Sequence, residues 1–249
     1  MIELEQAQVD VMVQDVDQPG TMVRRTLLEP VTARLTERRI AVIGANGSGK
    51  STLARLVNGL RHPTSGRVRT CGLDVVHDGP AVRSRVGFVF TDPDAQLVMP
   101  TAREDISLSL RRTTKRAERD ERAREVLARF GLADHAHSPV HALSGGQKQL
   151  LALAGVLATD PEVLVCDEPT TLLDLRWRTV IDEVLAGLDA QVLQVTHDLD
   201  AASRAERVLV VDRARVVFDG DPGEAVALYR ELMRPAATRP TPAAPGRRS

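Results

Sequence analysis

The sequence predicts an α/β fold with a mostly parallel core sheet, an N-terminal antiparallel β subdomain and an inserted helical subdomain. Short apolar runs that alternate with helical patterns predict the core sheet, because strands buried on both faces read as continuous apolar stretches. A glycine-rich turn joins one such strand to a helix and marks the start of the core. A charged helical segment interrupts the alternation later and predicts the insertion.

The elements follow from local patterns along the chain. IELEQAQVDVMV alternates as a half-exposed strand does, and VDQPG follows it as a turn signal. RRIAVIG then predicts a buried strand, and the helix after it has apolar residues on one face, at Leu53, Leu56, Val57 and Leu60. Further buried strands are predicted at EVLVCD, QVLQVTH and RVLVVD, and VLVVDRARVVFDG predicts a final hairpin.

Length and composition predict the domain organisation. A chain of 249 residues that is 43% hydrophobic can bury a large core, so we expect one domain over residues 1–234. The helical subdomain is expected at about 95–157 and contains RRTTKRAERDERAREVLARFGL. Residues 235–249 are rich in proline and alanine and predict a disordered tail, because they cannot bury enough apolar surface to order themselves.

The charge balance and the chain's hydropathy indicate a compartment. The 33 basic and 34 acidic side chains nearly cancel, so bulk charge does not indicate a nucleic-acid surface. No apolar run approaches the roughly 20 residues that a membrane span needs, and MIELEQ lacks the features of a signal peptide. We therefore expect a cytoplasmic chain. Cys71 and Cys166 fit reduced core residues better than a disulfide or metal framework.

The strongest chemical signal is GANGSGKS, between a predicted strand and a predicted helix. Its glycines let the backbone wrap around phosphate oxygens, its lysine reaches the β- and γ-phosphates, and its last serine can ligate Mg²⁺. This context predicts a P-loop NTPase core of the RecA-like type, since a chance glycine turn would lack it. The residues expected to bind nucleotide here are Gly44, Ala45, Asn46, Gly47, Ser48, Gly49, Lys50, Ser51 and Thr52.

Acidic residues follow a second buried strand. Asp167 and Glu168 come directly after EVLVC, at the carboxyl edge where parallel sheets bind ligands. Asp167 can hold Mg²⁺ through water, and Glu168 can orient or deprotonate the attacking water. His197 ends the strand in QVTH and could reach the γ-phosphate. Alone, the acidic pair could be a helix cap and His197 a satisfied histidine; beside the phosphate loop the catalytic interpretation is stronger.

A second anion site is indicated by ALSGGQKQLLALAGVLA, in which a serine and two glycines open an apolar helix. The first turn of a helix has unpaired N–H groups and a partial positive charge, so it can receive phosphate. The spacing of Leu150, Leu151, Leu153 and Leu157 predicts a helix with one buried face. Taken alone, this segment could equally be an ordinary N-cap.

The four motifs occur in the order and spacing of the ATP-binding subunits of ABC transporters, and the chain resembles that family over most of its length. The resemblance implies ATP hydrolysis with Mg²⁺, in which Lys50, Glu168 and His197 are catalytic. It also implies that two such domains pack head to tail, as a homodimer or with a second ATPase chain. The nucleotide-binding residues of one subunit would then reach the ATP held by the other from the serine-glycine motif, at Ser144, Gly145, Gly146 and Gln147. Asp174, also expected to bind nucleotide, resembles the family's loop that connects the two sites.

The subfamily is indicated by VFTDPDAQLVMPTAREDI and DEPTTLLDLR, which are similar to the energy-coupling-factor branch of importers. The segment VFTDPDAQLVMPT most resembles the ATPase of biotin importers, and the ATPases of cobalt or nickel importers are the next candidates. This implies a coupling transmembrane subunit, a small substrate-binding membrane subunit, no nucleic acid and a peripheral location on the cytoplasmic face of the cell membrane. Thr91 stands where the family has a glutamine, so either Thr91 acts through water or Gln96 takes over the metal contact.

Other features leave alternatives open. No aromatic residue precedes Phe88, so adenine would rest on Met12, Val23 or Arg24, with loose base selectivity. The histidines of ADHAHSPVH could bind a metal but fit a solvated loop better. The alternative to an importer subunit is a soluble ABC-type ATPase acting on DNA or ribosomes; the single set of motifs and the lack of an inserted coiled coil oppose it. An exporter ATPase often has a fused membrane domain, and no spanning segment is fused here.

Overall fold

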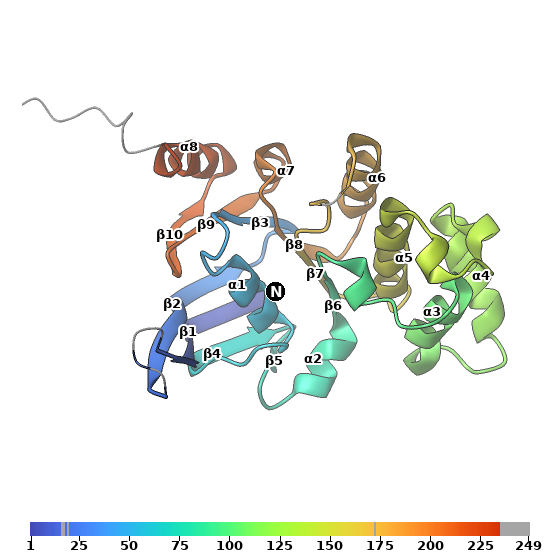
Figure 1. The fold of residues 1–249 in the computed structure, drawn as a ribbon, viewed down its shortest axis with the longest axis horizontal. Helices are drawn as coiled ribbons and strands as arrows, with labels where there is room; N and C mark the ends of the chain where they lie inside the picture. Colours follow the sequence, from blue (N-terminus) through green and yellow to red (C-terminus); the bar gives the residue numbers. More distant parts are fainter. Residues whose placement is uncertain (16–17, 19, 172, 235–249) are drawn as a thin grey trace, which may run out of the picture.

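The computed structural model describes residues 1–15, 18, 20–171 and 173–234. The predicted tail and part of the predicted VDQPG turn lie outside these residues. The N-terminal sheet consists of β1 (Ile2–Gln14), β2 (Met22–Leu35), β4 (Ser65–Thr70) and β5 (Leu73–Asp74). Their order is β2-β1-β4-β5, and every pairing is antiparallel (Figure 1). The predicted antiparallel start of the fold is therefore confirmed.

The core sheet has six strands. They are β3 (Arg39–Gly44), β6 (Val86–Val89), β7 (Val163–Asp167), β8 (Gln191–Val195), β9 (Arg207–Asp212) and β10 (Arg215–Gly220). The order is β10-β9-β3-β8-β7-β6, and neighbouring strands run parallel except for the β9-β10 hairpin. The mostly parallel core and the closing hairpin are thus as predicted.

Helices cover both faces of the core sheet, because successive strand residues point to opposite sides. The helices outside the insertion are α1 (Lys50–Val57), α2 (Gly79–Arg85), α6 (Leu175–Ala186), α7 (Leu199–Ser203) and α8 (Pro222–Leu232). Val42 and Val195 pack with α1 in a core shared with the N-terminal sheet. Ala41 and Val192 point to the other face, where α6, α7 and α8 lie (Figure 1).

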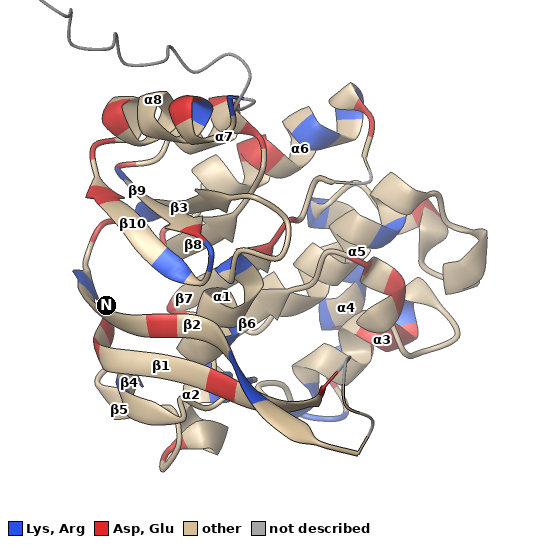
Figure 2. Ribbon diagram, turned by 60° about the vertical axis from the view of Figure 1, so that its left-hand side comes forward, with Lys and Arg blue, Asp and Glu red and all other residues tan. Residues whose placement is uncertain are grey.

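Short helices form a layer beside the β6 edge of the core sheet (Figure 1). They are η1 (Pro93–Ala95), α3 (Ala102–Ser109), η2 (Leu110–Arg112), α4 (Arg119–Arg129), η3 (Ala133–His135), η4 (Val140–Ala142) and α5 (Gly145–Leu157). Their apolar residues share one core with α6 and β7. Basic and acidic residues are interspersed over the elements (Figure 2), and Arg124 on α4 pairs with Asp120 and Glu121.

Two expectations about helices are wrong. Helix α5 is buried all round in its middle, over residues 149–155, because it lies between α3, α4 and the core sheet, so it does not have a single buried face. Helix α1 ends at Val57, and Leu60 lies beyond it with 46% of its surface exposed. Gly59, with φ +71°, follows the helix and turns the chain away before Leu60.

Candidate active site

The glycine loop between β3 and α1 is a tight turn fixed by its neighbours. A Cβ atom added to Gly44 would lie 2.1 Å from the carbonyl oxygen of Val211, so strand β9 leaves room only for glycine. Gly47 has φ +76°, a left-handed conformation that other residues rarely adopt. The turn therefore brings the chain into the start of α1, where unpaired backbone N–H groups attract anions.

Lys50 is the first residue of α1 and points back into the glycine loop. Its Nζ donates to the carbonyl oxygens of Gly44 at 2.9 Å and Ala45 at 3.0 Å, and lies 3.8 Å from Glu168 Oε1. Only 4% of the residue is exposed. Burial lowers the pKa of Lys50, although the carboxylates of Glu168 and Asp167 oppose this shift. The loop thus holds a poorly solvated cation beside two carboxylates.

Asp167 ends β7 and faces the start of α1. Its Oδ1 accepts from Ser51 Oγ at 2.7 Å, and its Oδ2 lies 3.5 Å from Arg55 Nη2. The residue is 2% exposed, and burial raises the pKa of Asp167 against the opposing effects of Ser51 and Arg55. Hydroxyl and carboxylate oxygens are the donors that Mg²⁺ prefers, so the pair formed by Ser51 and Asp167 fits that ion.

Glu168 is turned away from β7 by an unusual backbone. Its φ of +52° is left-handed, which costs a residue other than glycine about 1–2 kcal/mol. Its Oε2 accepts from Thr171 Oγ1 at 2.8 Å and lies 3.5 Å from His197 Nδ1. Glu168 Oε1 faces Lys50, as described above. The structure therefore brings the three predicted catalytic residues together at the carboxyl edge of the sheet.

Thr91 and Gln96 have different surroundings in the loop after β6. Thr91 Oγ1 donates to the backbone carbonyl oxygen of Asp167 at 2.6 Å. The Gln96 amide bridges two backbone groups at 3.2 Å each, since Oε1 accepts from Phe90 N and Nε2 donates to Ala152 O. Thr91 is therefore tied to the acidic strand end, whereas Gln96 braces its loop against α5.

Ser144 caps α5 through a reciprocal pair of hydrogen bonds. Ser144 Oγ accepts from Gln147 N at 3.3 Å, and Gln147 Oε1 accepts from Ser144 N at 2.9 Å. The Gln147 side chain also contacts His135, with 2.8 Å between Gln147 Nε2 and His135 Nε2. The first turn of α5 is thus held in a defined shape, with Gly145 and Gly146 inside it.

Asp174 caps α6 with its side chain, which accepts a single hydrogen bond from Trp177 N at 3.0 Å. Among the described residues, no hydrogen bond or ion pair joins Asp174, or any of residues 144–147, to residues 44–52. The structure therefore brings together the glycine loop, Asp167, Glu168 and His197, and it leaves the two helix starts apart from them within one chain.

The residues considered for adenine lie on the N-terminal sheet. Met12 on β1 pairs with Arg24 on β2, and Val23 is the next residue along β2. Met12 is 58% and Val23 37% exposed, while Arg24 forms an ion pair with Asp10. This surface offers exposed aliphatic groups and a cation whose charge is already paired.

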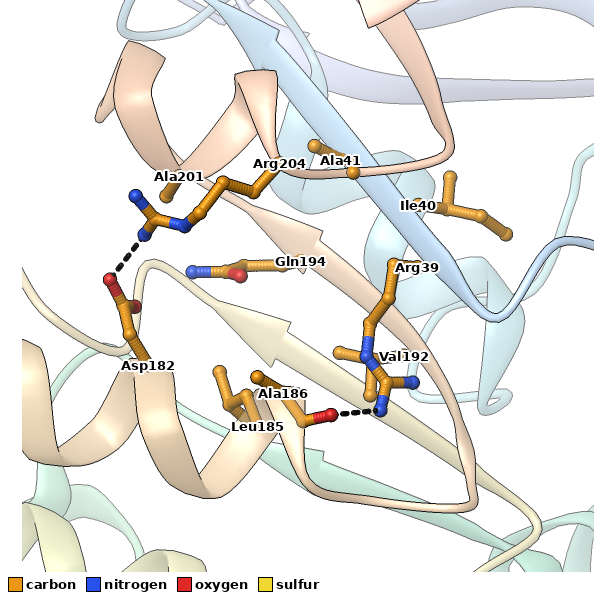
Figure 3. A pocket seen from close by; sticks show the side chains of 11 residues that line it. Arg39, Ile40, Ala41, Asp182, Leu185, Ala186, Val192, Gln194, Ala201 and Arg204 are labelled. Carbon is orange, nitrogen blue, oxygen red and sulfur yellow. Dashed lines mark hydrogen bonds and ion pairs between the residues drawn. The ribbon is translucent and has the colours of Figure 1, made fainter.

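A separate cavity lies on the other face of the core sheet, between α6 and α7. Among the residues that line it, Arg204 Nη2 and Asp182 Oδ2 lie 2.6 Å apart, and Gln194 on β8 lies beside them (Figure 3). Its lining contains none of the predicted site residues. This cavity is therefore distinct from the site around Lys50.

Two contacts in the site were missed by the sequence analysis. Thr171 bonds to Glu168, and its place three residues after Glu168 in DEPTT was a usable signal, because hydroxyls often bond to groups within the same turn. Arg55 faces Asp167 from the second turn of α1. Nothing in its local sequence indicated this, since arginine on a helix usually points to solvent.

A glycine loop at a strand-to-helix turn, with a buried lysine and two carboxylates at the next strand edge, defines a P-loop nucleotide-binding protein. Comparison with protein-family models narrows the class. The model described as ABC transporter matches residues 30–171, and the chain belongs to that family.

Known relatives agree with this assignment. The chain is 46% identical to the biotin transport ATP-binding protein BioM of Rhizobium etli, over 84% of this chain and 93% of that protein. It is 42% identical to the energy-coupling factor transporter ATP-binding protein EcfA1 of Halalkalibacterium halodurans, over 74% and 68% of the two chains. A dimeric structure of a post-hydrolysis state of the ATP-binding cassette MJ0796, bound to ADP and Pi, matches with TM-score 0.78 and 28% identity over 89% and 99%.

In the part of the chain that the structure describes, no helix combines the length and the apolar character that crossing a bilayer requires.

Proposed function

We propose that this chain is the ATP-hydrolysing subunit of an energy-coupling-factor importer, with biotin as the first candidate solute and cobalt or nickel as the next. The observation that carries the hydrolytic part is the convergence of Lys50, Asp167, Glu168 and His197 on the end of the glycine loop. The relatives named for biotin and energy-coupling-factor transport support the choice of system.

Each residue of the site has a part in hydrolysis. The glycine loop and Lys50 bind the phosphates, and Lys50 exchanges its loop carbonyl partners for phosphate oxygens. Ser51 and Asp167 would hold Mg²⁺, which neutralises negative charge on the phosphates when bound. Glu168 accepts a proton from the attacking water, and the water oxygen forms a bond to the γ-phosphorus. The bond between the γ-phosphorus and the β,γ-bridging oxygen breaks, which yields ADP and phosphate.

His197 and Thr171 orient Glu168 in this scheme. Both lie against its Oε2, at 3.5 Å and 2.8 Å, which leaves Oε1 for the water and Lys50. A carboxylate fixed by two neighbours loses less conformational freedom when it engages water.

Thr91 is the better candidate than Gln96 for the role of the family's glutamine. Thr91 already donates to the backbone carbonyl oxygen of Asp167. A movement of the Thr91 loop would therefore displace Asp167, whose carboxylate would hold the metal. Gln96 would have to break two hydrogen bonds with backbone groups first.

The start of α5 and the Asp174 loop act on a second subunit. Neither bonds to the glycine loop of its own chain, and both carry capped helix termini suited to an anion or a polar partner. A head-to-tail dimer, of two copies of this chain or with a second ATPase chain, would supply them to the other site. The dimer would sit at the cytoplasmic face of the membrane, below a coupling subunit and a small substrate-binding subunit.

Purification tests this proposal directly. Glu168→Gln keeps the shape of the side chain and removes the proton acceptor, so it should bind Mg·ATP but lose at least about 100-fold in kcat. The variant, purified from its native membrane in mild detergent, should bring a coupling protein and a small binding protein, identified by mass spectrometry. Biotin bound to the small protein would support biotin as the transported solute. Cobalt or nickel bound there instead would make that metal ion the solute. Ribosomal or DNA-bound partners instead would contradict the importer function and leave only the ATPase.

A further inference from the structure

The single tryptophan of the chain packs against the second glycine of the α5 start. Trp177 lies in the first turn of α6, three residues after Asp174, and is partly buried. A Cβ atom added to Gly146 would lie 2.2, 2.3 and 2.4 Å from three atoms of its indole ring. Real side chains do not approach so closely, and these ring atoms lie near the root of the side chain, where little movement is available. The indole therefore occupies the space that a side chain at residue 146 would need.

The neighbouring glycine has a different environment. A Cβ atom added to Gly145 meets nothing within 4 Å. Both glycines lie in the first turn of α5, so a change to alanine has a similar effect on helix propensity at each position. The requirement for glycine at residue 146, and not at residue 145, thus comes from Trp177 within the single chain.

This contact joins two helix starts that are far apart in the sequence. The backbone N–H of Trp177 donates to the Asp174 carboxylate. Trp177 is therefore part of the α6 cap, while its indole ring packs against the start of α5. Side chains from both helices also share one apolar core behind this point. The Asp174 loop and the serine-glycine turn are consequently fixed relative to each other.

We propose that Trp177 is a positioning residue that holds the starts of α5 and α6 as one rigid docking surface for the partner subunit. The proposal rests on the proposed function, in which both helix starts engage the partner's nucleotide. Trp177 lies in none of the contacts of Lys50, Asp167 or Glu168. It therefore acts on dimerisation and leaves nucleotide binding by one chain unchanged.

A thermal double-mutant cycle tests the contact. Gly146→Ala in the otherwise unchanged chain should lower Tm by roughly 5 °C, because the methyl group overpacks against the indole. The same change in a Trp177→Ala background should lower Tm by less than about 1 °C. Gly145→Ala is the matched control: its effect should be smaller than that of Gly146→Ala in the otherwise unchanged chain and similar to it in the Trp177→Ala background. Equal losses for Gly146→Ala in the two backgrounds would overturn the proposal.

The functional part needs a readout that separates docking from folding. In a Glu168→Gln background, Trp177→Ala should weaken the Mg·ATP-dependent dimer about tenfold, as measured by sedimentation, and leave the Kd of the monomer for Mg·ATP unchanged. Trp177→Phe keeps a ring over Gly146 and should retain most of the dimer affinity. Equal weakening of monomer binding would assign Trp177 a general structural role and overturn the proposal. If the parent chain neither dimerises nor hydrolyses ATP, the proposed function fails with the docking role, while the thermal cycle still tests the contact itself.

Discussion

At the scale of single residues, burial controls the charges of the active site. Lys50 and Asp167 are both almost completely buried. Burial lowers the pKa of Lys50 and raises the pKa of Asp167, so both shifts favour the uncharged form of the side chain. Hydrogen bonding from Ser51 and the charge of Arg55 keep Asp167 an effective anion. Such poorly solvated charges interact strongly with a charged ligand, because the local dielectric constant is low. The free chain is therefore less stable than a neutral site would make it.

The free-energy cost of burying the charged Asp167 carboxylate predicts the effect of Asp167→Asn. An amide has the same shape and no charge to desolvate, so at pH 7 the variant should have a higher Tm than the parent chain without nucleotide, by about 2–4 °C, corresponding to about 1 kcal/mol. It should also lose ATPase activity, since it loses a metal-binding carboxylate. Thermal unfolding followed by circular dichroism measures the first effect, and phosphate release the second.

The pH dependence of that difference checks its cause. Because the folded pKa of Asp167 is raised, the carboxyl group favours the folded state below its ordinary pKa, near 3.8, and this contribution is lost as pH rises through the folded pKa. The Tm advantage of the asparagine variant should therefore be complete at pH 7 and shrink toward pH 4. A lower Tm for the variant at pH 7 would mean that the contacts with Ser51 and Arg55 outweigh burial.

At the scale of elements, the start of α5 depends on a side chain from η3. The Gln147 amide has a fixed orientation, because its Oε1 accepts from Ser144 N. Its Nε2 is then the donor toward His135, so His135 Nε2 must carry the lone pair. The cap of α5 thus requires a hydrogen-bond acceptor at residue 135.

Two substitutions of opposite polarity test this requirement. His135→Gln places a carbonyl oxygen near the position of Nε2 and should keep both Tm and ATPase activity close to the parent values. His135→Lys presents only donors to Gln147 and should lower kcat about threefold to tenfold, in line with roughly 1 kcal/mol for a lost hydrogen bond. His137→Lys, at an exposed position in the same loop, controls for the added charge. Equal losses in the two lysine variants would contradict the role of His135.

The elements that could be predicted are those specified by contiguous residues. The β3-loop-α1 unit, the acidic end of β7 and the cap at Ser144 each follow from a short local pattern. Contacts such as Trp177 over Gly146 join segments that no periodicity relates, so they needed the structure. The burial of α5 was underestimated for a related reason. Its small residues, such as Gly155 beside Ser109, are no less buried than its leucines, although apolar periodicity counts mainly the larger side chains.

At the scale of the whole molecule, a dimer accounts for an exposed apolar side chain at the start of α6. Leu175, the residue after Asp174, is 80% exposed, the highest value among the large hydrophobic residues described as exposed. Burial of one leucine side chain contributes roughly 1.5–3 kcal/mol, and a symmetric dimer buries two copies. We therefore expect Leu175 to lie in the interface formed on Mg·ATP binding.

Leu175→Glu should abolish that dimer without unfolding the chain. The residue opens α6, where a carboxylate is favourable to the helix dipole, so Tm should be unchanged within about 2 °C. In a Glu168→Gln background, light scattering with Mg·ATP should find the parent chain as a dimer and the Leu175→Glu variant as a monomer, with a Kd raised at least tenfold. Leu60→Glu is the matched control, because Leu60 is also exposed but lies beyond the far end of α1, away from the glycine loop. A dimer that survives Leu175→Glu, or fails equally with Leu60→Glu, would exclude the head-to-tail arrangement with Leu175 in its interface.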